Sequence, residues 1–185
     1  LPNALDSTGR APLHVAAEKG CLAAVNALLT AGADSSLRYI DDEENNWTSL
    51  DLAASNGHVG IVIALNQSGA NVNAADGTGC TAVHKAACSN EIGVIDVLVE
   101  AGANADARNS TDASPLHVTA FQGLLPATNT LFAAGADVDA IDEGGKLTLH
   151  SAAGCGHQDM TRALVQAGAD VHAADRRGRT ALYFA

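Results

Sequence analysis

Seven histidines and four cysteines are the side chains of this 185-residue chain best suited to bind a metal ion or to act as a base or nucleophile. Four of the histidines, His14, His84, His117 and His150, recur in step with a repeated tetrapeptide. If each stands in its own stacked unit, helix-stacking distances place successive rings roughly 10 Å apart. That is too far for the rings to share one metal ion, so we expect a structural role for them and no metal site.

The rest of the chain shows no motif for catalysis or cofactor binding. The acidic run at residues 41–44 lacks the spaced oxygen ligands and the glycine of a calcium loop, so we expect a solvated insertion there. The sequence has no phosphate-binding glycine loop and no nucleophile elbow. We therefore expect no catalytic residues, no cofactor and no enzymatic activity. The cysteines form no C-x-x-C pair, which predicts free thiols in a reducing compartment; they are Cys21, Cys80, Cys88 and Cys155.

Two independent landmarks predict the elements that position these residues. Glycine–alanine pairs have spacings of 37, 33, 33 and 33 residues, and begin at Gly32, Gly69, Gly102, Gly135 and Gly168. A tetrapeptide follows the same interval, at residues 11–14, 48–51, 81–84, 114–117, 147–150 and 180–183. Two landmarks with one period predict a stacked array of repeats with one continuous core.

The tetrapeptides, such as Ser114-Pro-Leu-His117, together with the period of 33 residues, resemble the ankyrin repeat family over essentially the whole chain. The resemblance implies an all-α solenoid of paired antiparallel helices with β-hairpin fingers. Residues 1–185 then form a single array, with an insertion at 39–42 and with residues 1–5 matching the tail of a preceding unit. The expected repeats are 6–38, 43–75, 76–108, 109–141 and 142–174, followed by a partial repeat at 175–185.

Glycines predict where the helices end. In the first unit we expect helices over residues 11–19 and 22–31, separated by Gly20 and followed by Gly32 in the left-handed conformation. Asn90 replaces the glycine between the helices of the third unit, and Asn46 and Asp112 replace a hairpin glycine. We expect these three residues to be left-handed as well.

Apolar residues at equivalent positions of the units predict the core. Asn66 occupies one of these positions, where a buried amide without partners costs about 1–3 kcal/mol, so the second unit is the expected soft point. The expected buried residues are Leu13, Ala16, Ala17, Val25, Leu28, Leu29, Leu50, Ala53, Ala54, Val62, Leu65, Val83, Ala86, Ala87, Ile95, Leu98, Leu116, Ala120, Leu131, Phe132, Leu149, Ala152, Ala153, Leu164 and Val165.

The resemblance also implies a task for the repeated histidine, which bonds the hydroxyl of the tetrapeptide's first residue and the neighbouring backbone. Thr81 and Ser114 supply that hydroxyl in two units. Ala11 and Leu147 stand in its place in two others, so the histidines of those units must use the backbone alone.

The formal charge of −11 restricts the partners. It argues against nucleic acid, which needs a basic surface to replace phosphate counterions, and against anionic membrane surfaces. No apolar run is long enough to span a bilayer, and no signal-peptide pattern is present. We expect a monomer in the cytoplasm, with a nuclear location also open.

Members of the family meet their partners with the hairpin tips and the exposed ends of the first helices, so the resemblance implies a non-enzymatic module that binds another protein on this concave face. Trp47 stands at a hairpin position that is usually polar, and it either meets the partner or packs against the inserted Tyr39 and Ile40. The residues expected to contact a partner are Arg10, Arg38, Trp47, Arg108, Phe121, Gln122, Ile141 and Lys146.

Two other functions stay open. The chain can be the regulatory or targeting array of a larger enzyme or channel whose catalytic part lies outside it. It can also be a substrate for modification. The resemblance places Asn73 at the position that an asparaginyl hydroxylase modifies in some ankyrin proteins, which makes hydroxylation of Asn73 a further expectation.

Overall fold

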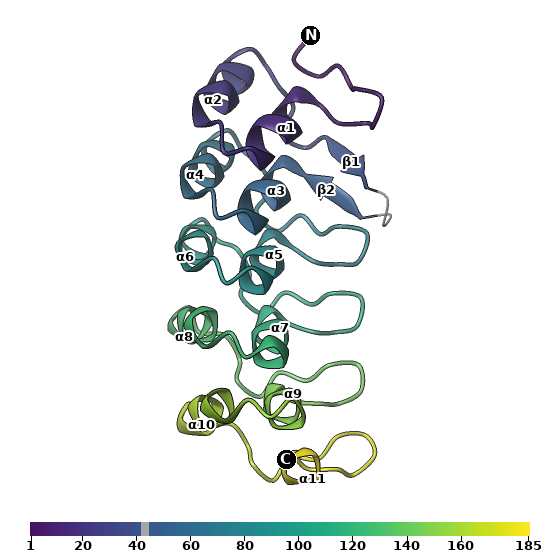
Figure 1. Cartoon of the computed structure of the whole chain (residues 1–185), viewed down its shortest axis with the longest axis vertical. Coiled ribbons are helices and arrows are strands. Elements are labelled where there is room, and N and C mark those ends of the chain that lie inside the picture. Colours follow the sequence, from purple (N-terminus) through teal and green to yellow (C-terminus); the bar gives the residue numbers. More distant parts are fainter. Residues whose placement is uncertain (42–44) are drawn as a thin grey trace.

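The computed structural model describes residues 1–41 and 45–185. Asp42, Glu43 and Glu44 lie outside the described residues, and with them most of the acidic run and the last residue of the predicted insertion. The described chain forms short helices that come in pairs (Figure 1). A hairpin loop, here called a finger, precedes the first helix of each pair and projects to one side of the stack.

The helices are short, and their order follows the repeats. The first helices of the units are α1 (Pro12–Glu18), α3 (Ser49–Ser55), α5 (Ala82–Cys88), α7 (Pro115–Gln122), α9 (Thr148–Gly154) and α11 (Ala181–Phe184). The second helices are α2 (Leu22–Thr30), α4 (Val59–Gln67), α6 (Ile92–Glu100), α8 (Leu125–Ala133) and α10 (Gln158–Gln166). Two strands, β1 (Arg38–Ile40) and β2 (Asn46–Thr48), form the second finger. None of the described helices combines the length and the apolar content that crossing a membrane requires.

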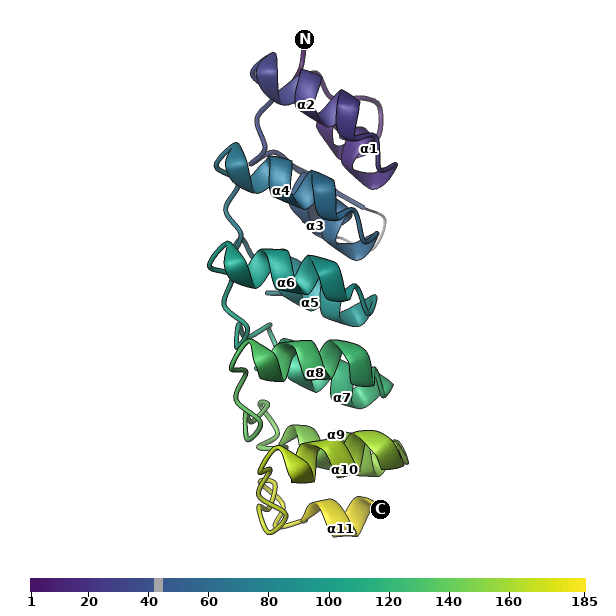
Figure 2. The same ribbon diagram turned by 90° about the vertical axis from the view of Figure 1, so that its left-hand side faces the viewer.

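Neighbouring units stack in sequence order, as Figure 2 shows from the side of the second helices. Each first helix packs on the next first helix, from α1 on α3 to α9 on α11, and each second helix packs on the next second helix. All extensive contacts between described elements lie within one unit or between adjacent units. The predicted solenoid is therefore confirmed. Its buried apolar residues form two clusters, one extending from Leu13 to Ala136 and one from Ala120 to Ala181, and the partly buried Phe132 packs against both.

The predicted left-handed residues are confirmed at two of the three non-glycine positions. Asn90 and Asp112 have φ of 58° and 55°. Gly20 has φ of +73°, and a Cβ atom there would lie 2.8 Å from the His58 ring, so glycine is required for two reasons. The prediction for Asn46 is wrong. This residue lies in β2 opposite Ile40, since the extra residues of the second unit lengthen both strands of its finger.

The fingers differ in how much strand they contain. Among the described residues, a regular ladder occurs only in the second finger, while the last two fingers have a single bridge each, Ile141 with Leu147 and Ala174 with Thr180. The other described fingers are closed by an acid or amide side chain. In the third finger, Asp76 Oδ1 accepts hydrogen bonds from the backbone N–H groups of Thr78 and Cys80, at 2.8 and 2.9 Å. Most of the predicted β-hairpins are thus side-chain-capped turns.

The predicted core is confirmed except in the first unit and at one position of the second helices. Leu98 is fully buried, as are its equivalents Leu65, Leu131 and Leu164. Leu28 holds the same position in the first unit but is only half-buried, as are Leu29 and Phe132. Val165 is 44% exposed. Leu28 lies in the first helix pair, where one neighbour is missing. Val165 shares its position with Leu29, Asn66, Val99 and Phe132, none of which is fully buried, so this position lies at the edge of the core in every unit. Asn66 is only half-buried, so the cost expected of a buried amide does not arise.

Candidate functional site

The repeated histidines are structural links between units. His84 shows the arrangement: its Nδ1 accepts the backbone N–H of Thr81 at 3.2 Å, and the Thr81 hydroxyl lies 3.0 Å from the same nitrogen. Because Nδ1 accepts, Nε2 carries the hydrogen and donates it to the carbonyl of Ala113 in the next finger, at 3.1 Å. The other links run from His14 to Leu37, from His117 to Lys146 and from His150 to Arg179. Both ring nitrogens are engaged in each case, which leaves no lone pair for a metal ion.

The remaining candidates for metal or thiol chemistry are dispersed. His58 and His157 lie in the turns between paired helices and donate from Nε2 to the carbonyls of Glu18 and Phe121, at 3.0 and 2.9 Å. All four cysteines are free thiols. Within residues 1–41 and 45–185, no group of three or more histidine, cysteine or acidic side chains could hold a metal ion.

The buried histidines predict that the array loses stability in mild acid. Burial lowers the pKa of His14, His84 and His117, although the hydrogen bond to a carbonyl opposes this in each case. The unfolded chain therefore binds more protons just below its ordinary histidine pKa of about 6.5, and the free energy of unfolding falls as the pH falls. We expect the urea midpoint to be lower at about pH 5.5 than at about pH 7.5, an interval above the titration of ordinary carboxyl groups. Equal midpoints at both values would contradict this sign.

The second unit has Asp51 where the other units have this histidine. The Asp51 carboxylate is buried and accepts hydrogen bonds from the backbone N–H and the hydroxyl of Thr48, at 2.8 and 2.7 Å. Burial raises the pKa of Asp51 despite these bonds. Within the described part of the chain, the Asp51 carboxylate is bonded to Thr48 alone, so the side-chain link that His84 makes to the following finger has no equivalent here.

An ion pair lies at the same junction instead. Lys85 Nζ lies 2.6 Å from Asp76 Oδ2, and it also lies 4.0 Å from the centre of the Trp47 ring. Trp47 Nε1 donates to Asp41 Oδ2 at 2.7 Å. Sequence reasoning missed Lys85, although a signal existed: the equivalent positions hold Val15, Leu52, Val118 and Ser151, none of which is charged.

Trp47 therefore packs within its own finger and against the next unit. It lies opposite Tyr39 in the ladder of β1 and β2, and it is half-buried. Of the two roles expected for Trp47, the structure shows the packing against the inserted Tyr39. A contact between a partner and the part of the Trp47 side chain that remains exposed is still a prediction.

The residues expected to contact a partner fall into two groups. Phe121 and Ile141 are 63% and 52% exposed, and Gln122 and Arg108 are also exposed. Arg10, Arg38, Trp47 and Lys146 are half-buried and have intramolecular contacts. For example, Arg10 forms an ion pair with Glu18 at 2.6 Å, and Arg38 donates to the carbonyl of Asn46.

Arg108 also has a structural contact that the sequence did not reveal. Its guanidinium donates to the carbonyl of Asp112 at 2.8 Å and to that of Ile141 at 2.5 Å, so it joins the fourth finger to the fifth. Its cationic group is nevertheless exposed and has no carboxylate partner among the described residues.

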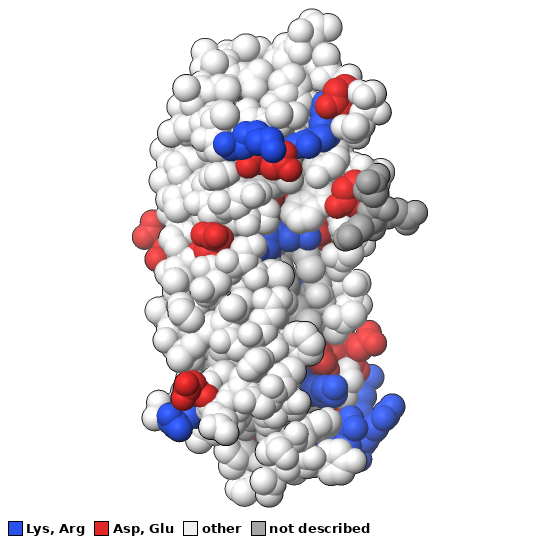
Figure 3. All heavy atoms as spheres, viewed as in Figure 1, with Lys and Arg blue, Asp and Glu red and all other residues white. Residues whose placement is uncertain are grey.

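The cations gather on one side of the array, here called the finger face, which consists of the fingers and of the first helices with the residues that end them. Nine of the ten Lys and Arg residues lie there; the tenth, Arg162, lies on the second helix α10. In the space-filling view the blue side chains lie mainly over the fingers and first helices, with a cluster at the last fingers in the lower right (Figure 3). On the second helices and the loops on either side of them, nine acidic residues accompany the single cation Arg162, so that side of the array has a net negative charge.

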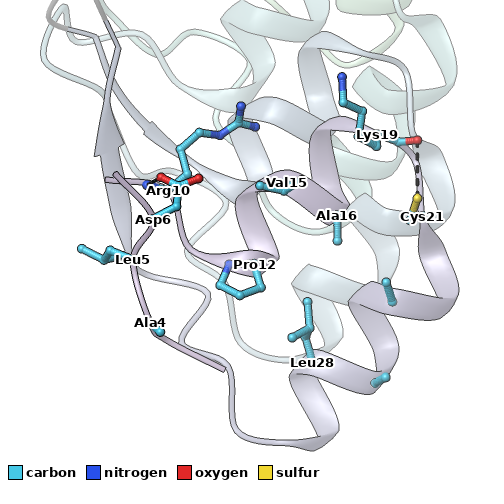
Figure 4. A pocket seen from close by; sticks show the side chains of 12 residues that line it. Ala4, Leu5, Asp6, Arg10, Pro12, Val15, Ala16, Lys19, Cys21 and Leu28 are labelled. Carbon is cyan, nitrogen blue, oxygen red and sulfur yellow. Dashed lines mark hydrogen bonds between the residues drawn. The ribbon is translucent and has the colours of Figure 1, made fainter. Parts of the chain in front are cut away.

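A wide cavity lies on the face of the first unit that corresponds to the stacking face of the later units. It measures about 730 Å³ and is lined mainly by apolar side chains of α1, α2 and the segment before them, among them Leu5, Pro12, Val15 and Leu28 (Figure 4). Leu65 and Leu98, which correspond to Leu28 in later units, are fully buried beneath a neighbouring unit. The cavity thus reflects an uncovered helix pair rather than a pocket built around polar groups.

Asn73, in the loop that follows α4, links adjacent units. Its Oδ1 accepts the backbone N–H of Asn104 at 2.8 Å, and its Nδ2 donates to the carbonyl of Gly102 at 3.1 Å. Asp106 and Asp139 accept the equivalent N–H groups of the next units. The side chain of Asn73 is exposed despite these bonds.

Comparison with known proteins agrees with this architecture. A family model described as ankyrin repeats (3 copies) matches residues 1–76, 39–109, 69–142 and 116–185. The chain is 40% identical over 77 residues to NF-kappa-B inhibitor alpha of Homo sapiens and to that of Sus scrofa, which covers 40% of this chain and 24% of each relative. It is 38% identical over 84 residues to glycerophosphocholine phosphodiesterase gde1 of Schizosaccharomyces pombe, covering 45% of this chain and 7% of that protein.

The chain thus spans about a quarter or less of the length of these relatives, and the similarity lies in the repeats. With the family model matched from end to end, the chain belongs to the ankyrin repeat family.

Proposed function

We propose that the chain is a non-enzymatic module that binds another protein through its finger face. The observation that carries the proposal is the exposed pair Phe121 and Ile141 on the side of the array that also holds nine of the ten cations. Exposed aromatic residues next to arginine are enriched among the residues that dominate binding energy. The similarity to a protein named as an inhibitor of NF-kappa-B supports a role in which the repeats act on another component.

A second candidate is a regulatory or targeting array within a larger enzyme or channel. The similarity to a phosphodiesterase favours this candidate. Only 7% of that protein is matched, which shows that similar repeats can form a small part of a protein named as an enzyme. The catalytic part would then lie outside residues 1–185, and the full-length coding sequence discriminates between the two candidates. Under either candidate we propose a monomeric array in the cytoplasm, with the nucleus left open, that binds neither nucleic acid nor membrane.

Hydroxylation of Asn73 remains part of the proposal. Its exposed side chain is accessible, and its two hydrogen bonds to the next unit are the contacts that a modifying enzyme would have to release first. Mass spectrometry of the native protein is the measurement that decides whether the residue is modified.

We expect Phe121→Ala to weaken binding of a captured protein partner by at least about 1 kcal/mol, a loss that a minority of interface residues reach. Folding should change little, because the Phe121 side chain is mostly exposed and its carbonyl still accepts from His157. The measurement is titration calorimetry with a partner isolated on the immobilised array.

Arg108→Ala should weaken binding similarly, but it also removes two bonds to backbone carbonyls, so Phe121→Ala is the cleaner variant. Gln166→Ala, on the exposed side of α10, is the control and should leave binding unchanged. If the control reduces binding while both finger-face variants retain it, the partner uses the second helices and the proposed face is wrong.

A further inference from the structure

The finger face carries a small cavity at the junction of the fourth and fifth units. It measures about 240 Å³ and is lined by Ala113, His117, Val118, Phe121, Asp142 and Ser151. Small-molecule pockets usually measure about 300–1,000 Å³. This cavity is smaller, and Phe121 in its lining is 63% exposed, so its size suits a single inserted side chain better than a whole small ligand.

Phe121 creates this cavity, and no other unit has its equivalent. The corresponding positions of the other units hold Glu18, Ser55, Cys88 and Gly154. The neighbouring first helix α9 carries only the small Ser151 toward the cavity, while Val118 and Phe121 of α7 supply apolar surface. A large side chain facing small ones leaves a depression with an apolar wall, and such a wall favours an apolar group from a partner.

Cations without carboxylate partners surround the cavity. Lys146 lies at its edge, because its carbonyl accepts from His117, which lines the cavity. Arg176 and Arg177 are exposed on the next finger. Among the described residues, no carboxylate lies within ion-pair distance of these three side chains. Lys146 is half-buried with its Nζ 5.6 Å from the centre of the Phe184 ring, while Arg176 and Arg177 present their charges to solvent.

Two of the four acidic groups nearby are engaged, and one of these, Asp142, lines the cavity. Asp142 Oδ1 accepts from the backbone N–H groups of Gly144 and Lys146, at 2.8 and 2.9 Å. Asp175 forms an ion pair with Arg179 at 2.6 Å. Asp112 and Glu143 remain as exposed acids on these fingers. The cations of these last fingers, with Arg108, exceed the four acids by one charge, so this part of the finger face is slightly positive on a chain with a formal charge of −11, which favours an acidic ligand here.

The fingers that hold these cations are joined to one another. Glu143 N–H donates to the carbonyl of Thr111 at 3.0 Å, and Arg176 N–H donates to the carbonyl of Gly144 at 3.1 Å. Arg176 also packs so closely on Gly145 that a Cβ atom there would lie 2.9 Å from its Cγ. A surface held in this way loses little conformational entropy when a ligand binds.

We infer that this part of the finger face binds an extended acidic segment of a partner protein. One large apolar side chain of the segment inserts beside Phe121, and the flanking carboxylates lie against Lys146, Arg176 and Arg177. The inference rests on the proposed function and specifies the chemistry of the partner.

The test uses a short fluorescent peptide with one phenylalanine among aspartate and glutamate residues, titrated against the whole chain by anisotropy. Two matched peptides replace either the acids by their amides or the phenylalanine by alanine. We expect each replacement to weaken binding at least about fivefold, and added salt to weaken the acidic peptide selectively. Phe121→Ala and Arg177→Glu in the protein should each have a similar effect.

Arg162→Glu is the matched control, because it makes the same change of charge on the second helix α10 and should leave the affinity unchanged. The inference is overturned if the amide peptide binds as well as the acidic one, or if Arg162→Glu weakens binding as much as Arg177→Glu. A third outcome separates the inference from the proposed function. If Phe121→Ala loses binding of a captured native partner but the unmodified chain has no affinity for the acidic peptide, the inference is rejected and the proposed function stands. If the native partner also ignores Phe121→Ala, both are wrong.

Discussion

Replacement of Leu98 by alanine is expected to lower the free energy of unfolding by about 2–5 kcal/mol, among the largest effects of any single change in this chain. Leu98 is fully buried in α6, which packs between α4 and α8. The substitution removes apolar surface from the core and leaves a cavity that the short stacked helices can fill only partly. Urea unfolding followed by circular dichroism measures the change.

Ser7→Ala is the control for this measurement. Ser7 is exposed on the first finger, and its substitution should change the free energy of unfolding by no more than about 0.5 kcal/mol. Equal midpoints for the two variants would contradict the burial of Leu98.

Replacement of Lys85 by valine is expected to lower the free energy of unfolding by about 3 kcal/mol, because it leaves the Asp76 carboxylate buried without its cation. Burial opposes ionisation of Asp76, yet the ion pair with Lys85 and the hydrogen bond from Thr78 hold its pKa below the ordinary value. The variant also removes the cation that lies over the Trp47 ring. This loss of unfolding free energy is at the low end of the range for a broken buried ion pair, because the Lys85 side chain keeps some contact with solvent.

The chain itself supplies the matched control for this effect. In the fourth unit the same two positions hold Asn109 and Val118, and Asn109 Oδ1 accepts from Thr111 and Ala113 as Asp76 Oδ1 accepts from Thr78 and Cys80. The double variant Asp76→Asn/Lys85→Val copies this natural pair and should recover most of the stability lost in Lys85→Val. If the double variant is no more stable than the single one, the loss comes from packing on Trp47 and not from an uncompensated charge.

The sequence alone was sufficient for the fold, because the repeat is local. The tetrapeptide, the glycine that ends each helix and the apolar positions lie within about thirty residues of one another, and every unit repeats them. Asn90 and Asp112 could be placed in the left-handed region for the same reason, since a substitution at a glycine position must respect that backbone. The hydrogen bonds of the repeated histidines were expected from the resemblance to ankyrin repeats.

The tertiary structure decided what happens between units and at the ends of the stack. Asn46 became a strand residue because its finger has a longer partner strand, and Leu28 lost burial because one neighbour is missing. Lys85, Asp76 and Trp47 meet across a junction of two units, and the cavity beside Phe121 exists because α9 presents small residues to α7. A period read from the chain gives each residue its position within a unit. The free energy of a side chain at a junction depends on which groups the next unit places against it, and only the packed array determines that.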